Sequence, residues 1–437
     1  MPASTLDNEE PQLFREIFPY SAPPRIPFDG VRVPPSPAAD PHITDTTFRD
    51  GQQARAPYTP EEIVHLFDLL HRLGGPAGLI RQSEFFLYTE RDRAAVEACQ
   101  DRGYRFPEVT AWIRAKTEDF TLVKAAGVRE TGILTSCSDY HIFKKLHLTR
   151  RQALENYLRV VDAALAEGIV PRCHFEDVTR ADIEGFVLPF ARLLMERSRE
   201  SGIQVKIRLC DTLGYGVGYD DAALPRSVPK LVHALRTRAE VPEAALEWHG
   251  HNDFHHGLPN AVTAWHYGCG AINGTLLGFG ERTGNTPIEG LVFEWMGLTG
   301  RGDVDTLAIT EVARYAGEQL SYRIPPMTPL VGEQSHVTAA GIHLDGLRKD
   351  AEIYSVFDTA KLLGKPPGVL VTDKAGAAGI ALWLEREQGL AAGSLGKDDP
   401  AVRRLLAWVE EQYREGRVTA VSDGELRALL AKEPQST

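Results

Sequence analysis

The chain has 437 residues, and 48 lysines and arginines against 60 aspartates and glutamates give it a formal net charge of −12. With 43% hydrophobic and 25% charged residues it is expected to be globular, and it lacks the basic excess that a general nucleic-acid binder needs. No run of apolar residues is long enough for a transmembrane helix, and the first residues do not resemble a signal peptide. The five cysteines are dispersed without a C-x-x-C pair, as is typical of reduced thiols. We therefore expect a cytoplasmic protein that binds neither nucleic acid nor a membrane.

The chain begins with a segment rich in proline and continues with a regular alternation. Residues 1–41 contain Pro23-Pro24 and Pro34-Pro35 and are predicted to form an extended N-terminal arm. From residue 42, short apolar runs alternate with longer amphipathic segments. The predicted strands are 42–48, 77–83, 108–113, 131–135, 169–175, 205–210, 246–249 and 271–276. The helices predicted to follow them are 60–73, 90–102, 119–126, 151–167, 181–199, 223–238, 257–267 and 288–296.

This alternation predicts an α/β fold in which a (β/α)₈ TIM barrel occupies residues 42–302. A doubly wound sheet is the alternative, but it expects G-x-G-x-x-G after the first strand. The nearest match, within residues 278–284, misses that spacing and follows the last strand. Beyond the barrel we predict a helical linker or lid subdomain at 303–365 and a small helical subdomain at 366–437.

The C-terminal ends of barrel strands are where function is expected, and one pair of histidines lies there. His249 and His251 are two residues apart, so on a strand their side chains share a face and can converge on one ion. Asp50, at the end of the first strand, adds a carboxylate across the mouth of the barrel. Without other evidence, a His-x-His pair is more often two hydrogen-bonded histidines than a metal site. Together with Asp50, the pair favours a catalytic divalent ion with open coordination positions.

Polar residues at two other strand ends suggest a pocket. Arg49 precedes Asp50 and is interpreted as a group that stabilises negative charge developing on a substrate oxygen. Arg172, His174 and Glu176 alternate along the fifth strand, so they share a face that suits a pocket floor better than a closed core. Taken alone, Arg49 and Glu176 would each be read as ordinary surface charges.

Three motifs, at residues 45–53, 249–253 and 280–285, together resemble the DRE-TIM metallolyase superfamily over about residues 42–355. The resemblance implies a divalent metal held by Asp50, His249 and His251, with Asn285 as a fourth ligand or close neighbour. Manganese is the expected ion, with magnesium, cobalt and zinc as alternatives. The resemblance also implies that Arg49 acts on the substrate oxygen. It assigns Thr212 and Gln53 to substrate binding.

The superfamily contains lyases and synthases, and the sequence favours a synthase. The lyases carry a cysteine in the loop after the eighth strand, whereas residues 277–285 contain none. Gly341-Ile342-His343 and the later Tyr354 resemble the C-terminal pattern of synthases that condense acetyl-CoA with a 2-oxo acid. That resemblance implies an obligate homodimer in which His343 and Tyr354 reach the partner's barrel. Glu176, His343 and Tyr354 are then the acid–base candidates, and a surface histidine is the alternative for His343.

Within this branch, segments 81–86, 138–141 and 371–374 most resemble the Re-citrate synthases. Arg172 is predicted to bind a second substrate carboxylate through its planar, bidentate guanidinium, with Arg81 in support and His174 limiting the pocket's length. We therefore predict condensation of acetyl-CoA with oxaloacetate to citrate and CoA. The alternatives are another 2-oxo acid, retro-aldol cleavage, and a non-catalytic metal-binding protein. Either arginine could instead pair with Glu84 or Asp211.

Overall fold

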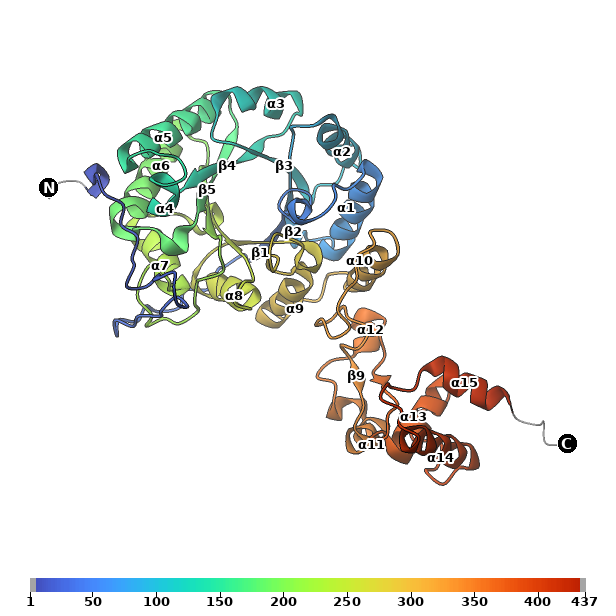
Figure 1. Ribbon diagram of the computed structural model, residues 1–437. Helices are drawn as coiled ribbons and strands as arrows, with labels where there is room; N and C mark the ends of the chain where they lie inside the picture. Colours follow the sequence, from blue (N-terminus) through green and yellow to red (C-terminus); the bar gives the residue numbers. More distant parts are fainter. Residues whose placement is uncertain (1–4, 433–437) are drawn as a thin grey trace. The chain divides into compact units, whose positions relative to one another are not determined.

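The computed structural model describes residues 5–432, and its central element is a closed barrel of parallel strands in sequential order (Figure 1). The strands are β1 His42–Asp45, β2 Ile80–Phe85, β3 Glu108–Ile113, β4 Glu130–Ser136, β5 Val170–Glu176, β6 Lys206–Asp211, β7 Leu246–Gly250 and β8 Ala271–Gly274. Strand β1 pairs with both β2 and β8, which closes the barrel. The predicted (β/α)₈ barrel is confirmed.

A ring of helices surrounds the strands. They are α1 Pro60–Gly74, α2 Glu90–Gln100, α3 Phe120–Ala125, α5 Arg150–Ala166, α6 Leu188–Ser201, α7 Val228–Arg238, α8 Gly257–Tyr267 and α9 Ile288–Thr299, with a short α4 Asp139–Ile142 after β4. Helices α1, α2 and α5 are preceded by the N-cap residues Thr59, Thr89 and Thr149, each of which forms a capping box that satisfies free backbone N–H groups. Apolar faces of the helices then pack on the barrel, as where Phe190 stacks on Phe175.

Two helices begin later than the sequence predicts. The helix expected at 181–199 begins at Leu188, because Ile183–Val187 form a π-helical turn before it. The helix expected at 223–238 begins at Val228, after Ser227, whose side chain accepts a hydrogen bond from the backbone N–H of Lys230. A serine cap of this kind fixes where a helix starts more strongly than the preceding apolar residues do.

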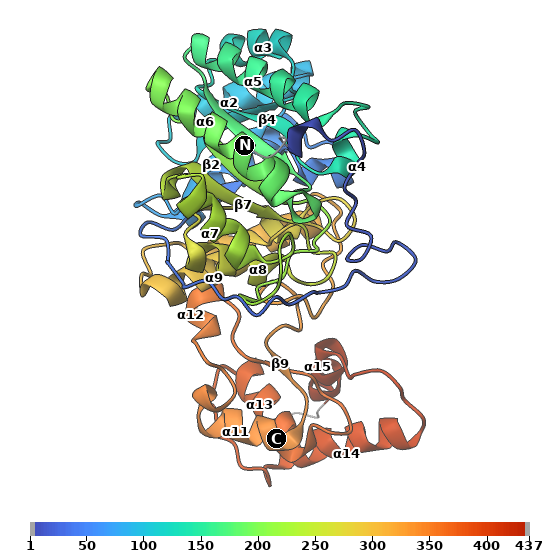
Figure 2. The ribbon, with the colours of Figure 1, turned by 90° about the vertical axis from the view of Figure 1, so that its left-hand side faces the viewer.

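The N-terminal arm lies against the barrel. At one end the backbone N–H of Gln12 donates to Asp139, which follows β4. Further along, the guanidinium of Arg226 donates to the backbone carbonyl of Arg25. Near β1 the backbone N–H of Ala38 donates to the carbonyl of Trp265 in α8, and the dark blue arm passes this helix in Figure 2. The arm therefore runs from the C-terminal ends of the strands towards their starts.

The chain divides into two compact units, Met1–Ala308 and Ile309–Thr437. The helices after the barrel are α10 Leu307–Glu318, α11 Gly341–Lys349, α12 Thr359–Leu363, α13 Gly376–Glu387, α14 Pro400–Arg414 and α15 Asp423–Ala431, with short strands β9 Val337–Thr338 and β10 Gly368–Val369. Leu344 and Leu347 pack with Ala375 and Leu382, so the segments expected as separate subdomains share a cluster. The predicted division into subdomains at 303–365 and 366–437 stays a prediction. Across residues 5–432, no helix is both long and apolar enough to cross a membrane.

Candidate metal centre

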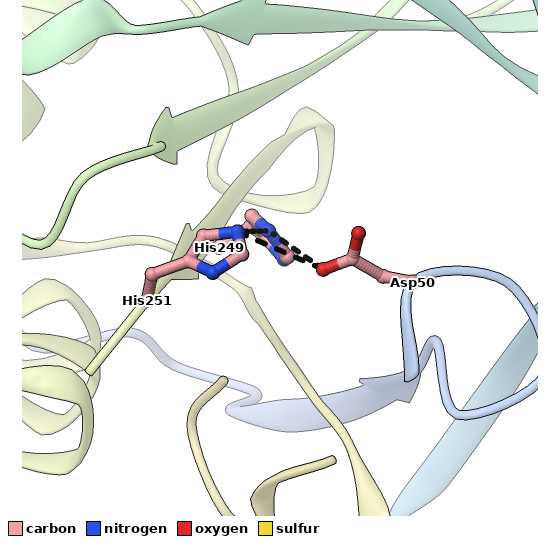
Figure 3. Close-up of side chains that lie close together, drawn as sticks. All are labelled: Asp50, His249 and His251. Carbon is pink, nitrogen blue, oxygen red and sulfur yellow. Dashed lines mark hydrogen bonds and ion pairs between the residues drawn. The ribbon is translucent and has the colours of Figure 1, made fainter. Parts of the chain in front are cut away.

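Asp50, His249 and His251 lie together at the mouth of the barrel (Figure 3). His249 is near the end of β7, His251 follows that strand, and Asp50 lies in the turn after β1. The Nε2 atoms of His249 and His251 are 3.6 and 3.7 Å from Oδ2 of Asp50. One potential ligand atom from each residue lies within 4.8 Å of the others, and all three residues are buried. These three predicted ligands can therefore share one ion.

The surrounding hydrogen bonds fit a metal at this position. Nδ1 of His249 lies 2.7 Å from the side-chain oxygen of Asn273, which favours the tautomer whose Nε2 lone pair faces Asp50. Asn285 donates its amide N–H to Oδ2 of Asp50 at 2.8 Å. The other side-chain atom of Asn285, Oδ1, is buried and has no hydrogen-bond partner within residues 5–432. A buried acceptor without a donor is costly, and an ion would satisfy it.

The charge states of the three residues also suit a cation. Burial opposes ionisation of Asp50, but Arg49 and the two imidazoles outweigh it and hold the pKa of Asp50 well below its usual range. Burial and the neighbouring His249 lower the pKa of His251 to about 4. At neutral pH the site thus offers one carboxylate and two neutral imidazoles, the forms that bind metal ions.

Arg49 is fixed beside this trio by three side chains. Its guanidinium donates to Oδ1 of Asp50 and to Oε2 of Glu84, both at 2.9 Å, and Nη2 lies 3.3 Å from Nδ1 of His174. The ring of Trp112 lies 5.1 Å from its Cζ. From the sequence, Glu84 is expected only as an ion-pair partner for Arg81 or Arg172. Its position on a buried strand, in phase with Gln82, was the available signal for a group inside the barrel.

The expectation that Arg172 binds a substrate carboxylate requires correction. Arg172 is 1% exposed and forms ion pairs with Glu130, with Glu247 at 3.2 Å and with Glu84 at 3.4 Å. Strand phase does place it inside the barrel, but it is the third residue of β5 and lies below the mouth. Carboxylates on β2, β4 and β7 already compensate its charge. Arg172 is therefore part of the barrel's interior, and we no longer assign it to the substrate.

Arg81 requires the same correction for a different reason. It is the second residue of β2, at the opposite end of the barrel from the metal trio, and its Nη2 donates to Asp40 at 2.7 Å. Its neighbours in sequence, Gln82 and Glu84, are the residues that meet Arg172 inside the barrel. Since side chains alternate along a strand, Arg81 points outwards.

Glu176 lies at the end of β5 in a cluster of polar groups. It accepts hydrogen bonds from Ser136 and, at 3.0 Å, from Lys145, and its Oε2 lies 2.8 Å from Nδ1 of His141. Burial raises the pKa of Glu176, but these donors outweigh it and lower the pKa to about 2. On the next strand end, the hydroxyl of Thr212 accepts a hydrogen bond from the backbone N–H of Asp177 at 2.8 Å. His141 is not among the site residues predicted from the sequence.

The remaining predicted site residues are exposed. Gln53 lies on the 3₁₀ turn η2 Gly51–Ala54, next to the metal trio in sequence but with an exposed side chain. His343 and Tyr354 belong to the second compact unit, where their ring centroids are 4.5 Å apart. The two rings therefore lie close enough to act together in proton transfer. Both side chains are exposed.

Comparisons with known proteins identify the family of the chain. The HMGL-like family profile matches residues 40–315. The chain is 56% identical to citrate (Re)-synthase of Syntrophus aciditrophicus over 98% of its own length and 68% of that protein. It is 49% identical to citrate (Re)-synthase of Clostridium kluyveri over 97% of its length and 94% of that protein.

A solved structure shows the same fold. Hydroxymethylglutaryl-CoA lyase from Pseudomonas aeruginosa superposes with a TM-score of 0.52 at 18% identity, covering 66% of this chain and 95% of that one. At that identity the likeness bears on the fold alone. The superfamily resemblance expected from the three motifs is confirmed, and the chain belongs to the HMGL-like family.

Proposed function

We propose that this protein condenses acetyl-CoA with oxaloacetate and that water then hydrolyses the resulting thioester to give citrate and CoA. The observation that carries the proposal is the convergence of Asp50, His249 and His251 beside Arg49 at the barrel mouth. The two curated relatives named citrate (Re)-synthase match nearly the whole chain and support oxaloacetate as the acceptor. Manganese is the ion we expect at Asp50, His249 and His251, with Asn285 Oδ1 as a further ligand.

The residues around the trio are suited to a reaction that builds negative charge on oxygen. A bound divalent ion supplies Lewis-acid polarisation of the 2-oxo acid's carbonyl group. Arg49 is held by Asp50 and Glu84, so its guanidinium is already oriented before the substrate arrives. A positioned donor of this kind stabilises charge that develops in the transition state, because it does not have to reorganise during the reaction.

Proton transfer is assigned to groups on the other side of the mouth. With a pKa of about 2, Glu176 stays ionised at neutral pH and is a weak base on its own. Its contact with Nδ1 of His141 is the arrangement by which a carboxylate orients an imidazole for proton transfer. We propose that Glu176 acts through His141, and that His343 and Tyr354 provide a second acid–base pair. Thr212 and His174 are proposed to contact the oxo acid.

The direct test is release of CoA, detected with a thiol reagent, from acetyl-CoA and a panel of 2-oxo acids. Oxaloacetate is expected to give the highest kcat/KM, well above 2-oxoglutarate, 2-oxoisovalerate and pyruvate. A preference for one of the other acids would assign the protein to a different synthase of the family. No release with any of them would exclude the synthase function.

We also propose a homodimer in which His343 and Tyr354 of one subunit complete the site of the other. The exposed ring pair is the observation that motivates it. Mixing inactive Arg49→Ala and His343→Ala chains, with subunit exchange, is expected to restore activity, because each heterodimer then has one intact site. The matched control mixes Arg49→Ala with His251→Ala, which leaves a defect in every barrel. No recovery in the first mixture despite proven exchange would contradict sharing.

A further inference from the structure

A group of cations surrounds one aromatic ring on the rim of the barrel, and the reaction proposed above does not use it. The ring is that of Tyr140 in α4, and its centroid lies 4.2 Å from Cζ of Arg180 and 5.5 Å from Cζ of Arg15. Nζ of Lys144 lies 5.8 Å from the same centroid. We call these four residues the Tyr140 cluster.

The N-terminal arm is fastened to this part of the rim, which is how Arg15 reaches it. The hydroxyl of Tyr140 donates to the backbone carbonyl of Leu13 at 2.8 Å. The backbone N–H of Gln12 donates to Asp139 at 2.7 Å, and the ring of Phe18 packs 5.9 Å from that of Tyr215 in the loop after β6. The arm lies outside residues 40–315, so the family match does not extend to Arg15.

Two of the cations on this rim are compensated by carboxylates and two are not. Arg180 pairs with Asp177 at 2.8 Å and Lys145 with Glu176 at 3.0 Å. By contrast, no ion pair within residues 5–432 includes Arg15 or Lys144, and both side chains are exposed. Glu16 is the carboxylate nearest Arg15 in sequence, and it too is exposed. In a chain with a net charge of −12, two uncompensated cations on one ring are well suited to an anion.

The cluster adjoins the proposed acid–base pair. His141 follows Tyr140 directly, and its Nδ1 lies 2.8 Å from Glu176. Asp177, the partner of Arg180, follows Glu176. An acyl thioester whose reacting methyl group lies beside Glu176 and His141 can extend the rest of the molecule over this adjacent part of the rim. In CoA the far end is a nucleotide with a 3′-phosphate and a diphosphate.

We propose that the Tyr140 cluster binds phosphate groups of the CoA portion of acetyl-CoA, with Arg15 and Lys144 as the phosphate ligands. The inference rests on the proposed function, since it takes acetyl-CoA as a substrate. Arginine offers planar donors that match a phosphate and lysine offers a compact charge, so the pair suits a nucleotide with several phosphate oxygens. The arm is thereby part of substrate binding.

The test compares acetyl-CoA with acetyl-pantetheine, which lacks the nucleotide. In Arg15→Ala and Lys144→Ala we expect the KM for acetyl-CoA to rise about tenfold and kcat to stay within about twofold, as for loss of one charge-assisted hydrogen bond. The KM for acetyl-pantetheine should not change. Arg32→Ala is the matched control, because Arg32 is another exposed arm arginine, with contacts of 3.7 Å and longer to Asp220 and Asp221. An equal rise in both KM values would overturn the inference and indicate a misplaced arm.

A binding measurement separates this inference from the proposed function. Adenosine 3′,5′-bisphosphate, titrated calorimetrically, is expected to bind the wild-type and Arg32→Ala proteins alike. It should bind Arg15→Ala and Lys144→Ala about tenfold more weakly. This experiment needs no turnover, so it gives an answer even if no 2-oxo acid releases CoA. Equal affinity for all four proteins, or no binding to the wild type, would overturn the inference.

Discussion

The interior of the barrel and its mouth both bury charged side chains, but they differ in how those charges are compensated. In the interior, Arg172 on β5 pairs with carboxylates from three other strands, β2, β4 and β7. At the mouth, Asn285 Oδ1 beside Asp50 is buried and has no hydrogen-bond donor within the described residues. A buried charge is therefore a poor indicator of function in this fold. A buried oxygen acceptor without a donor beside other potential metal ligands, such as Asn285 Oδ1, indicates a binding site better.

Glu84 connects the two regions. Its carboxylate accepts hydrogen bonds from Arg49 at the mouth at 2.9 Å and from Arg208 in the interior at 2.9 Å. Burial alone would raise the pKa of Glu84, but Arg208 and Arg49 outweigh burial and hold this pKa well below its usual range. The interior thus supplies a fixed anion on which the proposed catalytic arginine rests. If this division is correct, substitutions in the two regions should affect different properties.

The largest effect is expected at the mouth. Arg49→Ala should lower kcat about 10²–10³-fold, because it removes a positioned donor to the developing charge. Thermal unfolding should change little in comparison, since Glu84 keeps its contact with Arg208. Steady-state kinetics on oxaloacetate and a melting curve measure the two effects. A kcat within tenfold of wild type would remove Arg49 from the chemistry.

The next effect belongs to the interior. Arg172→Leu should lower the free energy of unfolding by about 1.5–3 kcal/mol, because it removes one guanidinium from the buried cluster while Lys206 still pairs with Glu130 and Arg208 with Glu247. The ratio of kcat/KM for oxaloacetate to that for pyruvate should not change. Urea unfolding and paired kinetics test this. Selective loss of oxaloacetate turnover in a stably folded variant would return Arg172 to the substrate pocket.

The same pair of proteins predicts a pH dependence. Burial alone would raise the pKa of Glu130 and of Glu247. Arg172 and other cations outweigh burial and lower both pKa values below the ordinary value of 4.5. Their folded-state pKa values lie below the unfolded ones, so their stabilising contribution is complete above about pH 4.5 and is lost as the pH falls further. The wild type should therefore exceed Arg172→Leu in unfolding free energy by the whole amount at pH 7. This difference should become smaller as the pH falls below 4.5. A constant difference would show that charge compensation is not its origin.

The smallest effect is expected at Arg81. Its ion pair with Asp40 lies at a partly exposed position, with side-chain exposures of 29% and 66%. Exposed pairs of this kind contribute about 0–1 kcal/mol. Arg81→Leu should therefore change stability by less than about 1 kcal/mol and leave the kinetics on every 2-oxo acid unchanged. A change in substrate preference would contradict its place outside the barrel.

These corrections show what the sequence could and could not predict. The alternation of apolar and amphipathic segments predicted the barrel, and strand ends with two-residue spacing predicted a metal trio. The alternation of side chains along a strand tells which face a side chain occupies, but not how far it lies from the mouth of the barrel. Arg172 is on the inner face, as predicted, but it lies below the mouth and not in the pocket. Arg81 is predicted to support Arg172 because relatives commonly have a glutamate at that point of the second strand, but β2 begins at Ile80 and places Arg81 at the start of the strand. The contact of His249 with Asn273 follows from the register of β7 and β8, which no single strand reveals.

The most direct test of the metal centre is metal content and turnover measured on one preparation before and after exhaustive chelation. We expect one divalent ion per chain, loss of CoA release on chelation, and recovery when manganese is added. His251→Ala should fold normally but neither retain the ion nor recover. Full CoA release from acetyl-CoA and oxaloacetate by protein shown to be metal-free would contradict the assignment of Asp50, His249 and His251 as the metal ligands on which catalysis depends.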